Sequence, residues 1–278
     1  MTQTPGRIHA DNALAWNQTR RWYEARVEEA LPSLADGGST LHPLEQRILS
    51  GLRPLEDWCD RAVHLQCAAG LDTHSLLNHG AAHCVGVDIA GDLVEAATDL
   101  SRRLGVQDRA SFVQADVLDL PSDLRGTADL VYTGKGAVHW MFDLAAWSRS
   151  VAQLLRPGGV FILFDFHAMM WMFRSDSPDV QASGVSYFAP TISYTEWAPG
   201  HVGDLDLPPD QLKRKRLRPW PPSAVIQGLL DNGLTLRAFG EYPDSLSPHW
   251  SAYPQWEDAD RRTVATTYSV IAIKPAEA

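Results

Sequence analysis

Two acidic residues, each at the end of a short apolar run, are the residues of this chain best placed to bind a nucleoside. Asp88 ends the run Val85-Gly86-Val87 and lies 18 residues after Gly70, and Asp116 follows a second apolar run at residues 110–115. A carboxylate at a strand end can accept hydrogen bonds from both ribose hydroxyls, and a second one can accept from an exocyclic amine of the base. The pair therefore predicts a site for a ligand with a ribose and a base.

The turn Cys67-Ala68-Ala69-Gly70 follows an apolar run and precedes a helical pattern, as phosphate-binding turns do. A dinucleotide fingerprint has three glycines there, but this chain has Gln66 and Ala68 at two of the three positions. The missing glycines disfavour a pyrophosphate, which needs close approach of the backbone. The turn instead favours a ligand with ribose and adenine but no phosphate, such as S-adenosylmethionine (SAM), and disfavours an NAD-dependent dehydrogenase.

The order of the apolar runs predicts an α/β fold. We expect strands at residues 62–67, 83–88, 110–115, 128–133 and 160–166, helices between them at 71–79, 92–104 and 144–155, and a closing helix at 223–232 with strands at 234–241 and 266–274. Strands that alternate with helices at this spacing form βαβ units and hence a parallel sheet. The sequence therefore predicts a Rossmann-like, mostly parallel, seven-stranded sheet with helices on both faces.

Four segments are expected along the chain. Residues 1–55 form an N-terminal helical lid, with helices at 13–30, broken by Pro32, and at 43–50. Residues 56–166 form the SAM-binding core, and residues 221–278 supply its closing helix and last two strands. Residues 167–220 have no sustained period and are too long for a plain connection, so we expect an insertion after the fifth strand that covers the substrate.

Composition limits the possible partners. The 278-residue chain has a formal net charge of −10, which argues against nucleic-acid and anionic-membrane partners and favours a small molecule. The basic run at residues 213–218 is interpreted as a solvated face. Cys59, Cys67 and Cys84 have no metal-ligand spacing, and we find no leader or membrane-length apolar run, so no metal site and a cytoplasmic location are expected. The oligomeric state is not predicted.

Several motifs, in order, carry a resemblance to a known family. They are His64-Leu65-Gln66-Cys67 with Gly70-Leu71-Asp72-Thr73, then Val85-Gly86-Val87-Asp88, Ala115-Asp116-Val117, Leu130-Val131-Tyr132-Thr133, Val138-His139-Trp140 and Leu154-Leu155-Arg156-Pro157-Gly158-Gly159. Together they resemble class I SAM-dependent methyltransferases over residues 55–170. The nearest likeness is to a bacterial small-molecule branch whose first motif reads "LHLQC…GLDT".

The resemblance implies positions for the cofactor. Cys67, Ala68 and Gly70 would line its methionine part, and Asp88 would hold its ribose. The adenine would pack on Ile89 and be held at its edge by Asp116 and Val117, while Thr133 would meet the amino-acid end. The leading helices, with Trp16, Trp22, Tyr23 and Arg26, would either close over the cofactor or pack on the sheet.

The substrate side is expected where the fourth and fifth strands end. His139 and His167 lie there and are candidates for a general base, because imidazole titrates near neutrality; the alternative is a structural role for each. Asp165 would orient a histidine or bind an amine, and Lys135 would be particular to the substrate. Aromatic walls suit a flat heteroaromatic or a cationic amine, although core packing is the alternative for each ring. The proposed walls are Trp140, Trp171, Trp197, Trp220 and Trp250.

These inferences lead to two functional hypotheses and two weaker alternatives. The leading one is a SAM-dependent methyltransferase that transfers a methyl group to N, O or C of a small molecule in specialised metabolism, with S-adenosylhomocysteine (SAH) as product. The second keeps the fold and SAM but catalyses a non-methylating cyclisation or isomerisation. A non-catalytic binding protein is disfavoured because Asp88 and Asp116 are intact, and a dehydrogenase is disfavoured by the turn.

Overall fold

The computed structural model describes residues 4–197, 202–243 and 252–276. Its centre is one sheet of seven strands in the order β3-β2-β1-β4-β5-β9-β8. The strands are β1 (Arg61–Leu65), β2 (His83–Asp88), β3 (Ala110–Gln114), β4 (Ala128–Gly134), β5 (Leu155–Phe166), β8 (Thr235–Pro243) and β9 (Ala265–Ile273). The first five run parallel, and β9 pairs antiparallel with both β5 and β8. The predicted Rossmann-like, mostly parallel sheet is confirmed.

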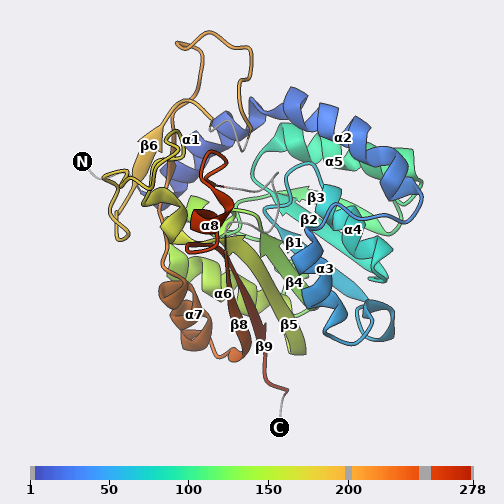
Figure 1. The fold of residues 1–278 in the computed structure, drawn as a ribbon. Helices are drawn as coiled ribbons and strands as arrows, with labels where there is room; N and C mark the ends of the chain where they lie inside the picture. The colour runs from blue at the N-terminus through green and yellow to red at the C-terminus, as the bar shows by residue number, and fades with distance from the viewer. Residues whose placement is uncertain (1–3, 198–201, 244–251, 277–278) are drawn as a thin grey trace.

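Helices cover both faces of the sheet, as Figure 1 shows. One face packs on α3 (Pro43–Ser50), α4 (Leu71–Asn78) and α5 (Gly91–Leu104), and the other packs on α6 (Leu144–Leu154) and α7 (Pro222–Asp231). Successive strand residues point to opposite faces of the sheet. Ala62 therefore packs in the buried cluster on the α3 and α4 side, and Val63 packs in the larger cluster on the α6 and α7 side. The central strands β1, β2 and β4 are buried on both sides, as is typical of a parallel sheet, whereas the edge strand β8 is largely exposed.

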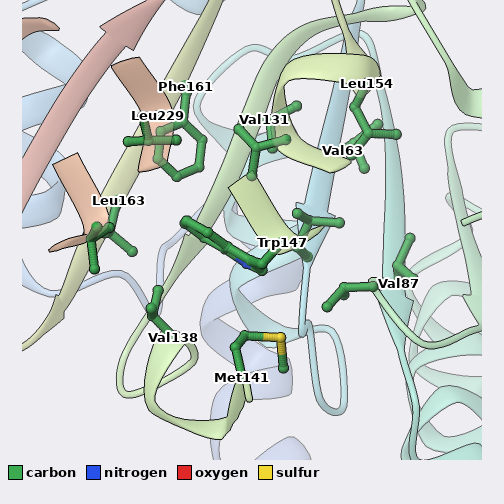
Figure 2. Close-up of a cluster of buried hydrophobic side chains, with 14 of the residues drawn as sticks. Val63, Val87, Val131, Val138, Met141, Trp147, Leu154, Phe161, Leu163 and Leu229 are labelled. Atoms are coloured by element: carbon green, nitrogen blue, oxygen red, sulfur yellow. The ribbon is translucent and has the colours of Figure 1, made fainter. Parts of the chain in front are cut away.

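Trp147 of α6 lies at the centre of the larger cluster and is fully buried. Figure 2 shows its ring beneath side chains of β4 and β5. It meets the ring of Phe161 edge to face, with the ring centroids 5.8 Å apart. This packing fixes α6 against the strands whose ends carry the predicted substrate residues.

The N-terminal helices differ from the sequence prediction. A single helix ending before Pro32 was expected, but the chain forms α1 (Pro5–Asn17) and α2 (Arg20–Ala35), with Pro32 inside α2. Pro32 lies in the last turn of α2, so the predicted break there is wrong. Helix α2 runs beside α5 in Figure 1, and α3 agrees with its predicted range.

The insertion carries structure of its own. After the short helix η4 (Ala168–Trp171), strands β6 (Ile192–Tyr194) and β7 (Lys215–Leu217) form a separate antiparallel pair. Strand β7 contacts α1 and the short helix η3 (Val138–Trp140), which follows β4. The insertion therefore lies over the carboxyl end of the main sheet, while the four-segment division stays a prediction. A further short helix, α8 (Asp258–Arg261), precedes β9, and no described helix is long and apolar enough to cross a membrane.

We predict that Trp147→Ala lowers the free energy of unfolding by about 3–5 kcal/mol, because it leaves a large cavity in the core. Urea denaturation followed by circular dichroism measures the change. Leu230→Ala on α7 is the control, because Leu230 is 42% exposed and its truncation should cost less than about 1 kcal/mol. Equal losses in the two variants would contradict the central place of Trp147.

Candidate functional site

The turn after β1 adopts the backbone of a glycine-rich turn without the glycines. Gln66, Ala68 and Gly70 have φ angles of 58°, 47° and 76°, so all three take the left-handed conformation. A residue with a Cβ atom is strained there by roughly 1–2 kcal/mol. Gln66 and Ala68 therefore keep the backbone geometry of the glycines that they replace, and contacts with neighbouring residues must stabilise that geometry.

Asp88 supplies much of that hold. Its Oδ2 accepts from the Ala68 N–H at 2.8 Å and its Oδ1 accepts from the Ala90 N–H at 2.9 Å. The carboxylate thus joins the turn after β1 to the turn after β2. Burial raises the pKa of Asp88, although these backbone hydrogen bonds act in the opposite direction. A buried carboxylate fixed in this way retains lone pairs for further donors.

Gln66 provides a second mark of a binding site. Its side-chain N–H donates to the carbonyl oxygen of Ala137, which lies after β4. Its Oε1 is buried and has no hydrogen-bond partner among the described residues. A buried acceptor without a donor is costly, and a ligand amine or hydroxyl at this turn would satisfy it. The turn thus fits a polar ligand between the ends of β1 and β4.

The other residues of the turn are packed rather than exposed. A Cβ on Gly70 would lie 2.7 Å from the Phe112 ring, and one on Gly86 would lie 2.8 Å from the Cys67 Sγ. Both glycines therefore let the turn sit close on the sheet. The Cys67 thiol is directed to this packed layer, and burial raises its pKa. Thr133, fully buried, donates its hydroxyl to the Leu65 carbonyl at 3.1 Å.

Asp116 has a partner that the sequence analysis missed. The His9 imidazole of α1 lies with Nδ1 2.9 Å from Asp116 Oδ2, and Asp116 Oδ1 accepts from the Leu118 N–H at 2.9 Å. Burial alone would raise the pKa of Asp116, but the hydrogen bonds and charge of His9 lower it. Val117 is buried in the larger core cluster, and Ile89 is half-buried beside Asp88. No local signal links His9 to a residue 107 positions away.

Helix α2 covers the same region. The charges of Asp88 and Asp72 act on the phenol of Tyr23 and, together with its burial, raise its pKa. Arg26 lies over the Trp22 ring, 4.6 Å from the centroid. Helix α1 therefore reaches Asp116 through His9, and the role of the N-terminal helices as a cover for the cofactor stays a prediction.

The turn after β4 is built on the same plan. Lys135 and Gly136 have positive φ angles of 60° and 94°. Fully buried Asp165 of β5 accepts from the backbone N–H groups of Gly136, Val138 and Phe166, the last two at 2.9 and 2.8 Å. Burial raises its pKa. Asp165 therefore fixes this turn, and its bonds in the structure are to backbone.

Lys135 lies in a buried cluster between α3 and α4. Its Nζ is 2.7 Å from the Asp72 carboxylate and 3.6 Å from Glu45, and it donates to the Thr40 carbonyl. Burial lowers its pKa, but the two acids outweigh this effect, so the pKa is raised. Glu45 also accepts from the Tyr132 hydroxyl, and burial raises the pKa of Glu45 to about 7. The predicted substrate role of Lys135 stays a prediction, and the structure places its ammonium among protein acids.

Both predicted general bases make hydrogen bonds through both ring nitrogens. His139 Nε2 lies 2.7 Å from the Phe166 carbonyl oxygen. Its Nδ1 lies 3.0 Å from the Arg218 carbonyl oxygen and 3.2 Å from the backbone nitrogen of Trp220. His167 Nδ1 accepts from the Met169 N–H at 3.1 Å, and its Nε2 lies 2.9 Å from Glu241 Oε1. Burial lowers the pKa of His167, and Glu241 opposes this. Their catalytic role stays a prediction.

The predicted aromatic walls are partly brought together. Trp140 and Trp197 are 5.9 Å apart and both contact Trp16 of α1, with centroid distances of 5.1 and 4.7 Å. The buried Lys215 ammonium lies 4.1 Å from the Trp197 ring, and burial lowers its pKa to about 8. Trp171 lies 4.3 Å from the His139 ring. Trp250 lies outside the described residues.

The Trp220 side chain is not part of this aromatic group and lines a separate cavity. Its ring stacks under the Arg218 guanidinium at 3.7 Å. With neighbouring residues it lines a cavity of about 320 Å³ at Phe188, Ala189, Arg218, Pro219, Trp220, Pro221, Ser223 and Ala224. This cavity contains none of the acids described above, so we do not assign it to the cofactor. In the described parts of the chain, no three His, Cys, Asp or Glu side chains are grouped to hold a metal.

Residues 62–159 match the model of a protein family described as "Methyltransferase domain". A curated relative is 27-O-demethylrifamycin SV methyltransferase of Amycolatopsis mediterranei, 31% identical over 134 residues, which are 47% of this chain and 48% of that one. Another is the chloroplastic tocopherol O-methyltransferase of Arabidopsis thaliana, 28% identical over 159 residues, 57% of this chain and 40% of that one. The chain spans less than half the length of the curated relatives it matches.

Solved structures share the fold. Geranyl diphosphate C-methyltransferase of Streptomyces coelicolor, in complex with Mg²⁺, geranyl diphosphate and SAH, has a TM-score of 0.56 at 15% identity, over 83% of this chain and 79% of that one. The [4+2]-cyclase SpnF has a TM-score of 0.58 at 14% identity, over 94% and 97%. The fold class is thus confirmed, and residues 62–159 are similar to a methyltransferase domain. The branch implied by the first motif stays a prediction.

The Glu45 cluster predicts a pH dependence of stability. The pKa of Glu45 is about 7 in the folded protein and 4.5 in its ordinary state. The folded state therefore binds more protons between these values, and the free energy of unfolding falls as the pH rises from 4.5 to 7. Glu45→Gln, which resembles the protonated form, should remove about 1–3 kcal/mol of that fall.

Urea denaturation at pH 4.5, 5.5, 6.5 and 7.5 measures the difference, with the exposed Glu29→Gln as the control. The control should follow the wild-type curve. Parallel curves for wild type and Glu45→Gln would show that Glu45 does not titrate in this range.

Proposed function

We propose that the protein is a SAM-dependent methyltransferase that acts on a small-molecule acceptor. The observation that carries the proposal is the turn at residues 66–70. It has the backbone of a glycine-rich nucleotide turn, is held by Asp88, and presents an unpaired buried Gln66 oxygen. It also lies inside the segment that matches a methyltransferase domain.

The residues of the site fit SAM. Asp88 would accept from the ribose hydroxyls and Asp116 with Val117 would bind the adenine edge, with Ile89 against its ring. Gln66, Ala68, Gly70 and Thr133, with Cys67 behind them, would surround the methionine part. The cofactor supplies an activated methyl group on its sulfonium when bound, so the protein needs no activating group for methyl transfer.

The remaining task of the chain is to position the acceptor and exclude water. The Trp16, Trp140 and Trp197 contacts join α1, the turn after β4 and the insertion into one aromatic layer. We place the acceptor beside this layer, with Trp171 and Lys135 at its borders. Asp165 would keep the turn at residues 134–138 rigid under the acceptor.

The acceptor is proposed to be a small molecule of specialised metabolism, methylated on O, N or C. The names of two curated relatives, a demethylrifamycin and a tocopherol methyltransferase, support a small-molecule acceptor. A net charge of −10 disfavours a nucleic-acid acceptor. The cytoplasmic location expected from the sequence is part of this proposal.

A second function is retained because both histidines at the site are bonded through both nitrogens. A reaction that needs no base, such as a cyclisation shaped by the pocket, is compatible with that arrangement. The fold likeness to a [4+2]-cyclase extends over 94% of this chain. Incubation with methyl-labelled SAM and a panel of phenols, aromatic amines and polyketides distinguishes the two, because SAH accumulates only when a methyl group is transferred.

Isothermal titration calorimetry tests the cofactor. We expect SAM and SAH to bind the full-length protein with micromolar or tighter affinity and NAD to bind at least about 100-fold more weakly, because the turn has side chains where a pyrophosphate needs glycine. Tighter binding of NAD than of SAM would overturn the proposed function.

Asp88→Ala should weaken SAM binding about 100-fold, since hydrogen bonds to a charged group contribute about 1.5–3 kcal/mol. Calorimetry measures the affinity, and thermal unfolding shows whether the turn remains folded. Asp99→Ala, an exposed acid on α5, is the matched control and should bind SAM like the wild type. Unchanged affinity in a folded Asp88→Ala variant would refute the ribose assignment.

A further inference from the structure

Neither His139 nor His167 has a free ring nitrogen that could take a proton from the methyl acceptor. His139 Nε2 must donate to the Phe166 carbonyl, and its Nδ1 faces the Trp220 N–H and the Arg218 carbonyl. His167 Nδ1 accepts from the Met169 N–H, so this ring is neutral and its proton is on Nε2. That proton is donated to Glu241 Oε1 at 2.9 Å. The His167 imidazole therefore holds the Glu241 carboxylate in position.

Glu241 is placed beside the predicted substrate residues by the sheet register. It pairs with Tyr268 of β9, and Tyr268 pairs with Asp165 of β5. Residues paired across antiparallel strands project on the same face, so these three side chains form a row at the end of β5. The side chain of Glu241 is 50% exposed, whereas Asp165 is fully buried and bonded to backbone. Glu241 is thus the acid of the row that a ligand can reach.

Two phenols border the His167 imidazole that holds this carboxylate. The rings of Tyr187 and Tyr268 lie 6.1 and 5.9 Å from the His167 ring. The Tyr268 hydroxyl is buried, and no described residue forms a hydrogen bond with it. Aromatic faces next to a carboxylate are a favourable surrounding for an organic cation.

We infer that Glu241 anchors a protonated amine on the acceptor, with His167 as the positioning residue that holds its carboxylate. This inference rests on the proposed function and names the substrate class of that site. An ammonium keeps the charge-assisted bond from His167 to Glu241, whereas removal of a proton by Glu241 would weaken it. The acidic chain, with its net charge of −10, also attracts a cation.

Binding of three matched probes to the SAH-saturated, full-length protein tests the inference. The probes are phenethylamine, phenethyl alcohol and phenylacetate, which share a ring and differ in charge, and ligand-observed NMR titration gives their affinities. We expect phenethylamine to bind at least about 10-fold more tightly than the alcohol, and phenylacetate to bind most weakly. Equal affinities, or no binding of the amine, would overturn the inference.

Three variants connect the preference to its residues. Glu241→Gln should abolish the preference for the amine, and His167→Gln should reduce it while leaving affinity for the alcohol unchanged. Glu257→Gln, an exposed acid at the start of α8, is the control and should retain it. A preference that survives Glu241→Gln would contradict the inference.

SAM titrations on the same samples separate this test from that of the proposed function. Glu241→Gln and His167→Gln should bind SAM like the wild type. If the wild type binds SAM but shows no amine preference, only the anchor is refuted, whereas failure of the wild type to bind SAM refutes the proposed function itself.

Discussion

The structure depends on a buried carboxylate that holds a strained turn through backbone N–H groups. Asp88 at the end of β2 binds the turn after β1 at Ala68, and Asp165 at the end of β5 binds the turn after β4 at Gly136 and Val138. In both cases the acid comes from the neighbouring strand and the turn contains residues with positive φ. Two turns at the same edge of the sheet are thus fixed by one kind of interaction, and the proposed site lies between them.

This device explains how a turn without three glycines keeps its shape. Gln66 and Ala68 occupy conformations that cost roughly 1–2 kcal/mol each, and a charge-assisted hydrogen bond contributes a comparable amount. The balance is therefore close to neutral before any ligand binds. A donor that satisfied the buried Gln66 oxygen would add to the stabilisation. Such a turn is rigid enough to orient a ligand and still gains from binding it.

The sequence predicted those features that depend on local pattern. Strand and helix order, the turn after β1 and the acid at the end of β2 all follow from residues close together in the chain, so periodicity and spacing were sufficient. The partners of those residues were not predictable in this way. His9 meets Asp116 and Glu241 meets His167 across 107 and 74 positions, and Lys135 pairs with Asp72 and Glu45. Side-chain pairing of that kind depends on tertiary contacts. A sequence motif contains only one residue of each such pair, so the other residue could not be predicted from it.

The long-range pairs also show how the helices at residues 5–35 enter the site. His9 of α1 is bound to Asp116, and Tyr23 of α2 lies in the field of Asp88. On the proposed function, a nucleoside bound to Asp116 would lie near α1 as well as the sheet. The ligand's contacts would be shared between the strand ends and this segment, so changes in α1 and α2 would alter cofactor affinity without touching the glycine-like turn. The proposed cofactor site would consequently be assembled from the N-terminal helices as well as from the strand ends.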